Sequence, residues 1–355
     1  MPSAASPIYY TRNSRMIESR DPESLVADLT RQGVESAYAL IKSKIKRTPV
    51  LTNESISTIA TGSDRIQTTL FFKCENFQKG GAFKIRGATY ALEMLKAEDL
   101  ENGVITHSSG NYGQALAIAA KAKGIKAYIV MPSNSARPKI EATKSYGANV
   151  HFSGPTAPER EYVTETIRKT TNARLIPPYD HPHIILGQGT VLLELMCQTQ
   201  VEYGQQLDAV IVPVGGGGLL AGCALAAQGT GVRVFAAEPA LADDCFRGVE
   251  AGRRVPTVTT TTVADGLRTP VGIINFPIIQ KYVEKVFTVS EEEILAAMRL
   301  VWERMKIVVE PSGAVPLAVA LSDRWKVEGV NGKVGIVLSG GNVDLDKVGE
   351  LLKKS

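Results

Sequence analysis

The chain has 355 residues, of which 44% are hydrophobic and 21% charged, a composition typical of soluble globular proteins. The formal net charge of +4 is small for this length and the basic residues are dispersed, so nucleic acid is not an expected partner. No apolar run reaches the roughly 18 to 20 residues of a membrane span and the N-terminus lacks a signal-peptide core, so we expect no membrane association and a cytoplasmic location.

Cysteine and histidine spacing predicts neither a disulfide framework nor a zinc site, because no CxxC pair is present. We expect buried or partly buried thiols at Cys74, Cys197, Cys223 and Cys245. His181 and His183 are separated by a proline, which indicates a loop.

The first 25 residues are polar and without periodicity, and we expect a flexible arm there. Residues 25–45 have helical apolar spacing, which the Arg-Thr-Pro sequence at 47–49 interrupts. A β-rich run at 68–74 is followed by a glycine-containing loop and by helical spacing over 82–95. This order predicts a strand, a loop and a helix.

Strand and helix patterns then alternate along the rest of the chain. Strands are expected at 104–106, 127–131, 149–152, 208–214, 232–237 and 334–338. Helices are expected at 112–123, 139–146, 160–170, 189–203, after 218, and from a capping box at 290–293 to about 306. The alternation predicts an α/β architecture of mostly parallel, helix-covered sheets, in which ligands lie beyond the carboxyl ends of strands.

Four consecutive glycines stand between an apolar strand pattern and an Ala/Leu-rich helix pattern. They are Gly215, Gly216, Gly217 and Gly218. Backbone N–H groups at the start of a helix, without side chains in the way, form a cradle for phosphate. A tight turn without a ligand is the alternative interpretation.

Lys84 stands at the start of the expected 82–95 helix, after a loop that contains two glycines. A lysine that forms a Schiff base needs a lowered pKa, which partial burial supplies. Phe83 beside it could support a planar cofactor. Taken alone, Lys84 is better explained as a solvated charge on a helix, and the Schiff-base interpretation depends on its combination with the other motifs.

Two polar turns follow other expected strands. The turn of Ser108, Ser109, Gly110 and Asn111 opens a helix and offers hydroxyls, an amide and free backbone donors, which suit a carboxylate or a phenolic oxygen. An N-cap without a ligand is the alternative. Ser339 begins the similar turn at 339–342 and could hydrogen-bond a ring nitrogen.

Three carboxylates lie in residues 238–244 at the end of a strand pattern. Carboxylate oxygens together with a free backbone carbonyl favour a hard divalent cation such as magnesium or calcium. A solvated acidic loop is the alternative.

Taken together, these motifs resemble the fold-type II pyridoxal-phosphate enzymes, and within them the group of serine racemase and of serine/threonine and hydroxyaspartate dehydratases. The resemblance runs from about residue 47 to 345 in order. Its motifs are Lys-Cys-Glu-Asn-Phe-Gln-Lys at 73–79, Phe-Lys-Ile-Arg-Gly-Ala at 83–88, Ser-Ser-Gly-Asn at 108–111, Gly-Gln-Gly-Thr at 187–190, Pro-Val-Gly-Gly-Gly-Gly at 213–218, Ala-Glu-Pro at 237–239 and Leu-Ser-Gly-Gly-Asn at 338–342.

The resemblance implies a tryptophan-synthase-β-like fold of two three-layer α/β/α domains, with pyridoxal 5'-phosphate as cofactor. Lys84 would hold the cofactor and act as base on one face of Cα, and Ser109 would be the acid/base on the other. Asn111 would bind the phenolic oxygen of the cofactor, residues 215–218 its phosphate and Ser339 its pyridine nitrogen.

The resemblance also implies a divalent-cation site of Glu238, the carbonyl of Ala242 and Asp244. Arg160 matches an arginine that contacts the substrate carboxylate, and Thr269 replaces a serine in the same neighbourhood, while Ser108 and Gly110 belong to the substrate-binding turn. One position departs from the family pattern, because Tyr112 stands where a histidine is usual. Its backbone N–H can still receive a carboxylate, but the larger side chain points to a modified pocket or to neutral drift.

The expected function is removal of the Cα proton from a small β-hydroxy-amino acid, which leads to β-elimination, to racemisation, or to both. The alternatives are a lyase or β-replacement enzyme acting on a β-substituted or dicarboxylic amino acid, and a regulatory pseudo-enzyme that binds the cofactor. We expect a large cofactor domain from residues 26–102 and 181–355, a small mobile domain from 103–180, and a homodimer.

Overall fold

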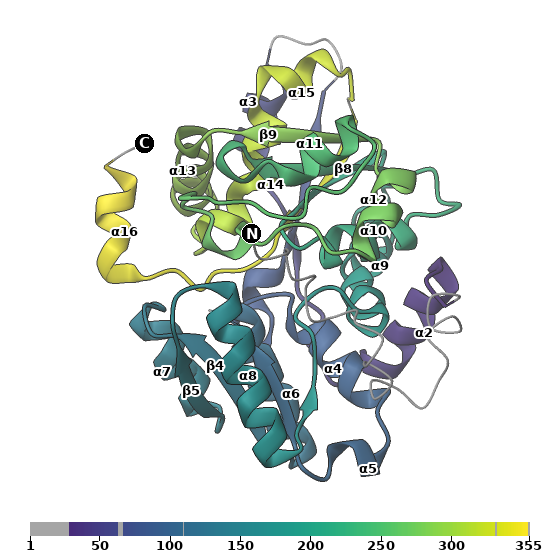
Figure 1. The fold of residues 1–355 in the computed structure, drawn as a ribbon. Helices are drawn as coiled ribbons and strands as arrows, with labels where there is room; N and C mark the ends of the chain where they lie inside the picture. Colours follow the sequence, from purple (N-terminus) through teal and green to yellow (C-terminus); the bar gives the residue numbers. More distant parts are fainter. Residues whose placement is uncertain (1–27, 63–66, 109, 331, 354–355) are drawn as a thin grey trace.

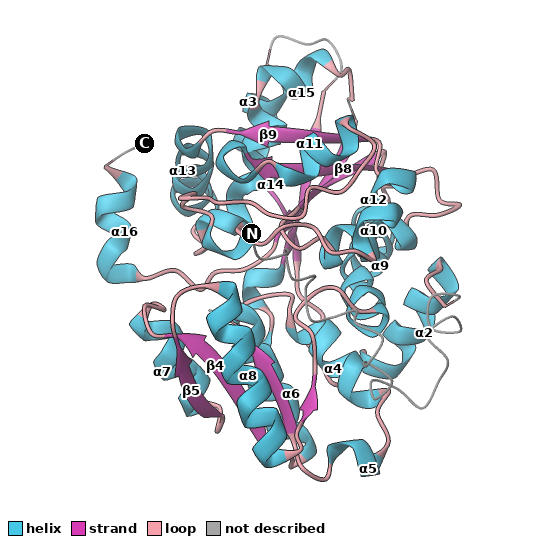
Figure 2. Cartoon of the chain, in the orientation of Figure 1, coloured by secondary structure: helices cyan, strands magenta, loops and turns pink. Residues whose placement is uncertain are grey.

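The computed structural model describes residues 28–62, 67–108, 110–330 and 332–353. In this part of the chain, strands and helices form two bodies, each built around its own sheet (Figure 1). Figure 2 shows helices on both sides of the strands. No helix of the described residues is long and apolar enough to cross a membrane.

The larger sheet has six strands in the order β1-β2-β10-β7-β8-β9. Its strands are β1 (Val50–Thr52), β2 (Thr69–Cys74), β7 (Ala209–Pro213), β8 (Arg233–Pro239), β9 (Lys285–Val289) and β10 (Lys333–Leu338). All neighbours are parallel except β1, which pairs antiparallel with β2. The carboxyl ends of β2, β10, β7 and β8 therefore lie along one edge of the sheet.

Helices cover both faces of the larger sheet. One face packs against α3 (Glu54–Thr61), α13 (Glu291–Leu300), α14 (Pro311–Leu321) and α15 (Asp323–Val327). The other packs against α2 (Arg31–Ile41), α4 (Ile85–Glu93), α9 (Pro182–Tyr203), α10 (Gly218–Ala226) and α12 (Asn275–Tyr282). Successive residues of a strand alternate between the two cores, as in β7, where Val210 faces one and Ile211 the other. α11 (Asp244–Glu250) lies beside β9, and α16 (Leu345–Leu352) beside α13.

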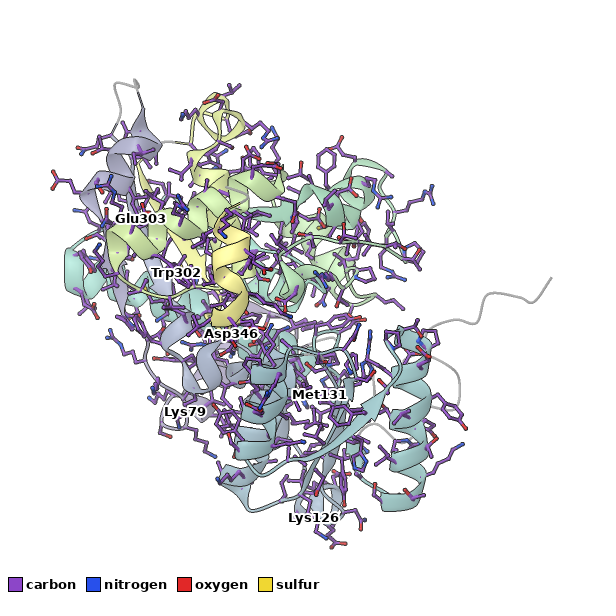
Figure 3. The ribbon with its side chains drawn as sticks, turned by 90° about the vertical axis from the view of Figure 1, so that its left-hand side faces the viewer. Lys79, Lys126, Met131, Trp302, Glu303 and Asp346 are labelled. Atoms are coloured by element: carbon purple, nitrogen blue, oxygen red, sulfur yellow. The ribbon has the colours of Figure 1, made fainter. Side chains whose placement is uncertain are left out.

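The smaller sheet has four parallel strands in the order β5-β4-β3-β6. They are β3 (Val104–His107), β4 (Ala127–Pro132), β5 (Asn149–Ser153) and β6 (Arg174–Leu175). α6 (Asn111–Lys123) and α7 (Arg137–Ser145) pack together against this sheet, and α8 (Ala157–Thr171) packs against it separately. The short helix α5 (Ala97–Leu100) precedes β3. Figure 3 labels Met131 of β4 in this lower body and Trp302 in the upper one.

One apolar core continues from the larger body into the smaller. It includes Ala88 and Leu92 of α4 and also Tyr112 and Leu116 of α6, all buried. The contact between α4 and α6 therefore joins the two bodies directly behind the segment that carries Lys84.

Most elements predicted from apolar periodicity are confirmed, with shifts of a few residues at their ends. The capping box at Ser290 is present, and its helix continues into a π-helical turn at Val301–Met305. The loop expected at residues 181–183 is wrong, because His181 caps α9 and Pro182 is the first residue of that helix. At this position the backbone N–H has no partner within the helix, so proline, which lacks an N–H, is tolerated. Cys197 is exposed rather than buried. The arm expected at residues 1–25 lies outside the described residues.

Candidate active site

Three candidate segments follow three neighbouring strands of the larger sheet. The segment with Lys84 follows β2, the turn that begins at Ser339 follows β10, and the glycine run follows β7. Because β2, β10 and β7 are adjacent and parallel, their carboxyl ends bring these segments to one edge of the sheet. Segments more than 250 residues apart in the chain thus become neighbours.

The segment before Lys84 is bonded to the turn after β10. The Phe83 N–H donates to the Ser339 carbonyl at 3.1 Å, and the Gly341 N–H donates to the Gly81 carbonyl at 2.9 Å. Gly81 has φ +70°, and a Cβ there would lie 2.5 Å from the Asn342 side chain. A side chain at this position would separate the two segments, so glycine is required.

Lys84 lies immediately before α4 and is partly buried. Burial lowers the pKa of its amine to about 8, and the carboxylate of Glu310 opposes this shift. Its Nζ lies 4.9 Å from the centroid of the Phe83 ring. The amine is thus available in its neutral form close to physiological pH.

Asn111, from the smaller body, contacts the same edge of the larger sheet. It is the first residue of α6, and its Oδ1 accepts a hydrogen bond from Asn342 Nδ2 at 2.9 Å. Its Nδ2 donates to Glu310 Oε1 at 2.6 Å. A Cβ at Gly340 would lie 2.6 Å from Glu310 Oε1. The turn after β3 and the turn after β10 therefore share one polar cluster.

Glu310, Lys139 and Asp265 are part of this cluster although no motif marks them. Lys139 Nζ of α7 lies 2.5 Å from Asp265 Oδ2 and 3.9 Å from Glu310 Oε2. Burial raises the pKa of Glu310 to about 7, and Lys139 opposes the shift. Burial disfavours the charge of Lys139, yet Glu310 and Asp265 outweigh it and raise the pKa of that amine. The only sequence signal at Glu310 is its place before Pro311, which begins α14.

The glycine run forms a tightly enclosed loop at the start of α10. Gly217 has φ +90°, a conformation that favours glycine. A Cβ would lie 2.8 Å from the Leu267 Cα at Gly215 and 2.5 Å from the Tyr179 ring at Gly216. The loop therefore presents backbone without side chains, at a helix start whose free N–H groups favour an anion.

The turn after β3 is described except for Ser109, which lies outside the described residues. Ser108 Oγ accepts a hydrogen bond from the Gly110 N–H at 3.2 Å. A Cβ at Gly110 would lie 3.0 Å from the Lys139 Cδ. Tyr112, in the first turn of α6, is buried, and its Oη has no hydrogen-bond partner among the described residues.

Arg160 lies close to the carboxyl end of β3. Burial lowers the pKa of His107, the last residue of β3, to about 4, and the charge of Arg160 lowers it further. Arg160 Nη1 also donates to the Pro155 carbonyl at 2.9 Å. Thr269 is exposed in the segment after the 3-10 turn Asp265–Leu267. Arg160 thus lies near the turn that begins at Ser108. Thr269 is two residues after Leu267, which packs on Gly215.

Glu238 and Asp244 form a buried acidic pair at the carboxyl end of β8. Glu238 accepts the N–H groups of Cys245 and Phe246, both at 2.8 Å. Burial raises the pKa of Glu238 well above its ordinary value, and the charge of Asp244 raises it further. Asp244 Oδ1 is buried without a partner in the described part of the chain. No group of three or more His, Cys, Asp or Glu side chains able to hold a metal occurs in that part.

A buried ion cluster anchors the helix that follows Lys84. Arg86 donates to both oxygens of Glu75, at 2.7 and 2.8 Å, and to Glu194 of α9 at 2.7 Å. Lys73 of β2 also donates to Glu194, at 2.8 Å. The two cations and two carboxylates are fully buried and tie α4 to β2 and α9. The motifs at 73–79 and 83–88 contain three of these residues.

Comparison with known proteins establishes the family of this chain. A family model described as "Pyridoxal-phosphate dependent enzyme" matches residues 41–340. The chain belongs to this family. Serine racemase of Dictyostelium discoideum is 44% identical over 331 residues, which cover 92% of this chain and 99% of that protein. The family and the fold-type II α/β architecture expected from the motifs are thus confirmed, and the protein is a pyridoxal-phosphate enzyme.

Solved structures give the same result. The structure of maize serine racemase has a TM-score of 0.85 and 42% identity, and the match covers 92% of this chain and 97% of that one. The threonine deaminase of T.th. has a TM-score of 0.81 and 40% identity, and the match covers 88% of this chain and 98% of that one. The similarity therefore extends to the whole fold of both relatives.

Proposed function

We propose that this protein removes the Cα proton of a small β-hydroxy-amino acid, and that β-elimination to a keto acid and ammonia, racemisation, or both follow. The observation that carries the proposal is the convergence of the Lys84, Ser339 and glycine segments at the carboxyl ends of three adjacent strands. The relatives named serine racemase and threonine deaminase support this class of reaction.

The residues present fit pyridoxal phosphate. Lys84 is an amine with a pKa lowered to about 8, which suits covalent attachment to an aldehyde, and the glycine loop at the start of α10 would offer backbone N–H groups to a phosphate. Asn111 would bind the phenolic oxygen and the buried Ser339 the pyridine nitrogen, with Phe83 beside the ring. When bound, the cofactor supplies an electron-withdrawing ring that makes the Cα–H of an attached amino acid acidic.

Two residues of the chain would move protons at Cα. Lys84 would take or return a proton on one face, since its amine is uncharged over part of the physiological pH range. Ser109 would act on the opposite face, which is what inversion at Cα requires. A substrate that loses its β-hydroxyl instead would follow the elimination route.

The turn after β3 would hold the substrate carboxylate. Ser108, Gly110 and the backbone of Tyr112 lie at the start of α6, where free N–H groups favour an anion. Arg160 would add a positive charge near the same end of β3, and Thr269 would lie on the other side of the substrate. The side chain of Tyr112 is buried in the apolar core, which fits a position used through its backbone N–H. The alternative is a modified pocket for a β-substituted or dicarboxylic amino acid.

Glu238, the carbonyl of Ala242 and Asp244 would hold magnesium or calcium. Two buried carboxylates that repel each other, one with an unpaired oxygen, would be relieved by a divalent cation. The cation would stabilise the end of β8, next to the strand that carries the glycine loop.

The whole molecule would be a cytoplasmic homodimer with two domains. Residues 103–180 would form the small mobile domain and residues 26–102 and 181–355 the large one. All four strands of the smaller sheet come from one continuous segment of the chain, which supports this division. Closure of the small domain would exclude water from the reacting atoms.

Reduction of the enzyme with borohydride, followed by peptide mapping, tests the attachment of the cofactor. The expected result is a pyridoxyl label on Lys84 alone, and Lys84→Ala should fold but show no turnover. A label on another lysine would overturn the assignment.

Product analysis over the stereoisomers of serine, threonine and 3-hydroxyaspartate tests the reaction. Keto acid and inverted amino acid are measured separately for the wild type and for Ser109→Ala. We expect Ser109→Ala to lose racemisation more than elimination, because only inversion needs a group on both faces. Equal loss of the two activities would contradict the role of Ser109.

A further inference from the structure

Asp180 lies where the chain enters the larger body after β6, next to the start of α12. Its two carboxylate oxygens accept three backbone N–H groups, from Ile273 at 2.8 Å, Ile274 at 2.9 Å and Asn275 at 3.2 Å. These are the residues at which α12 begins. A single carboxylate therefore fixes the first turn of this helix.

The helix start fixed in this way holds the glycine loop. Asn275 is completely buried, and its Nδ2 donates to the Gly216 carbonyl at 2.7 Å. The Gly272 N–H donates to the same carbonyl at 3.1 Å. A Cβ at Gly217 would lie 3.0 Å from the Asn275 Cβ. Asn275 thus both bonds to the loop and packs beneath it.

Tyr179, the neighbour of Asp180, packs on the loop from the same segment. A Cβ at Gly216 would lie 2.5 Å from its ring, and a Cβ at Gly218 would lie 2.8 Å from its carbonyl oxygen. Residues 179 and 180 thus reach the loop by two routes, directly through Tyr179 and indirectly through α12. With the Gly216 carbonyl bonded to Asn275 and Gly272, the backbone orientation of the loop is fixed.

We infer that Asp180 and Asn275 are positioning residues for the phosphate of the cofactor: Asp180 sets the start of α12, and Asn275 then holds the Gly216 peptide so that the loop presents its N–H groups to the anion. This inference rests on the proposed function, in which residues 215–218 bind the phosphate. Neither side chain needs to touch the cofactor, because both act through the loop backbone.

The test compares two cofactor forms that differ only in the phosphate. Wild type, Asp180→Asn and Asn275→Asp holoenzymes are dialysed against graded pyridoxal phosphate or pyridoxal, and bound cofactor is read from its absorbance. Asn275→Asp keeps the shape of the side chain but places an oxygen opposite the Gly216 carbonyl. Asp208→Asn is the matched control, because Asp208 also accepts a backbone N–H, from Lys333 at 2.7 Å, but precedes β7 at its other end.

We expect both variants to bind pyridoxal phosphate at least tenfold more weakly than the wild type, with affinity for pyridoxal and the behaviour of Asp208→Asn unchanged. Equal loss of affinity for the two forms would mean a merely structural role and would overturn the inference. If both variants keep the wild-type affinities, the inference about Asp180 and Asn275 is overturned, but the proposed binding of phosphate by residues 215–218 is not affected. A wild type that does not prefer pyridoxal phosphate over pyridoxal would overturn the proposed loop function as well.

Discussion

At the scale of single residues, the ionisation of Lys84 sets a pH dependence. Its pKa of about 8 in the folded protein lies below the ordinary lysine value because the charged amine is buried. Only the neutral amine attacks an aldehyde, so the rate at which apoenzyme takes up pyridoxal phosphate should rise about tenfold per pH unit below pH 8 and level above it. Stopped-flow absorbance measures this rate.

Glu310→Gln sharpens this test. The carboxylate of Glu310 raises the pKa of Lys84, so its removal should move the uptake profile to lower pH. An unchanged or higher midpoint in Glu310→Gln would contradict the electrostatic contact between the two side chains.

Tyr112 carries a buried hydroxyl that has no partner in the described part of the chain. An unpaired buried polar group costs about 1 to 3 kcal/mol, so Tyr112→Phe should raise the free energy of unfolding by about 1 kcal/mol in urea titrations. Tyr203→Phe is the control with the opposite expected sign. Tyr203 Oη donates to the Val50 carbonyl at 2.7 Å, so loss of this hydrogen bond should lower the free energy of unfolding. Destabilisation by Tyr112→Phe would reveal a hydrogen-bond partner.

The site residues that could be predicted from the sequence are those in short motifs directly after expected strands. Lys84, Asn111, Ser339 and the glycines belong to short motifs whose chemistry is local. Glu310, Lys139 and Asp265 could not be predicted in the same way, because each is an ordinary charge in its own segment and gains meaning from contacts across more than 40 residues. Asp180 was missed for the same reason.

At the scale of elements, α4 is placed by buried charges. Arg86→Met would leave Glu75 and Glu194 buried with Lys73 as the only cation of the cluster. Removing one partner of a buried ion pair costs about 3 to 5 kcal/mol, which urea unfolding of the holoenzyme would measure. Arg233→Met removes an exposed ion pair with Glu284 and should cost less than about 1 kcal/mol. Similar costs for the two variants would count against the anchoring role.

Element prediction succeeded where apolar periodicity was clear and failed where length or composition concealed it. β1 has three residues and lies at the sheet edge, so it offers too short a pattern. α14 is apolar on every side and contains Pro316, which obscures helical periodicity although the helix is central. The helix expected over 25–45 is described only as Arg31–Ile41, and its first three expected residues lie outside the described chain.

At the scale of the whole molecule, the proposed cation should contribute to global stability. Chelation should lower the melting temperature of the wild type, and added magnesium or calcium should restore it, because the Glu238 and Asp244 charges would otherwise remain buried and uncompensated. Differential scanning fluorimetry measures both steps.

Two variants test whether this effect depends on the proposed cation ligand Asp244 rather than on any acidic residue nearby. Asp244→Asn should melt at a temperature that no longer responds to chelator. Asp243→Asn, whose carboxylate pairs with Arg247 at 2.7 Å, should respond like the wild type. If the melting temperature of the wild type does not change on chelation, the proposed cation site is wrong.

The position of β10 in the larger sheet determines when the active site can form. β10 follows β2 and β7 by more than a hundred residues in the chain, yet it lies between them in the sheet. Until β10 is inserted, β2 and β7 share no neighbouring strand, and the turn that begins at Ser339, which bonds to the segment before Lys84, is missing from the pocket. A ribosome-bound chain that stops before Leu338 therefore cannot yet bind the cofactor in this pocket, and cofactor capture comes late in synthesis.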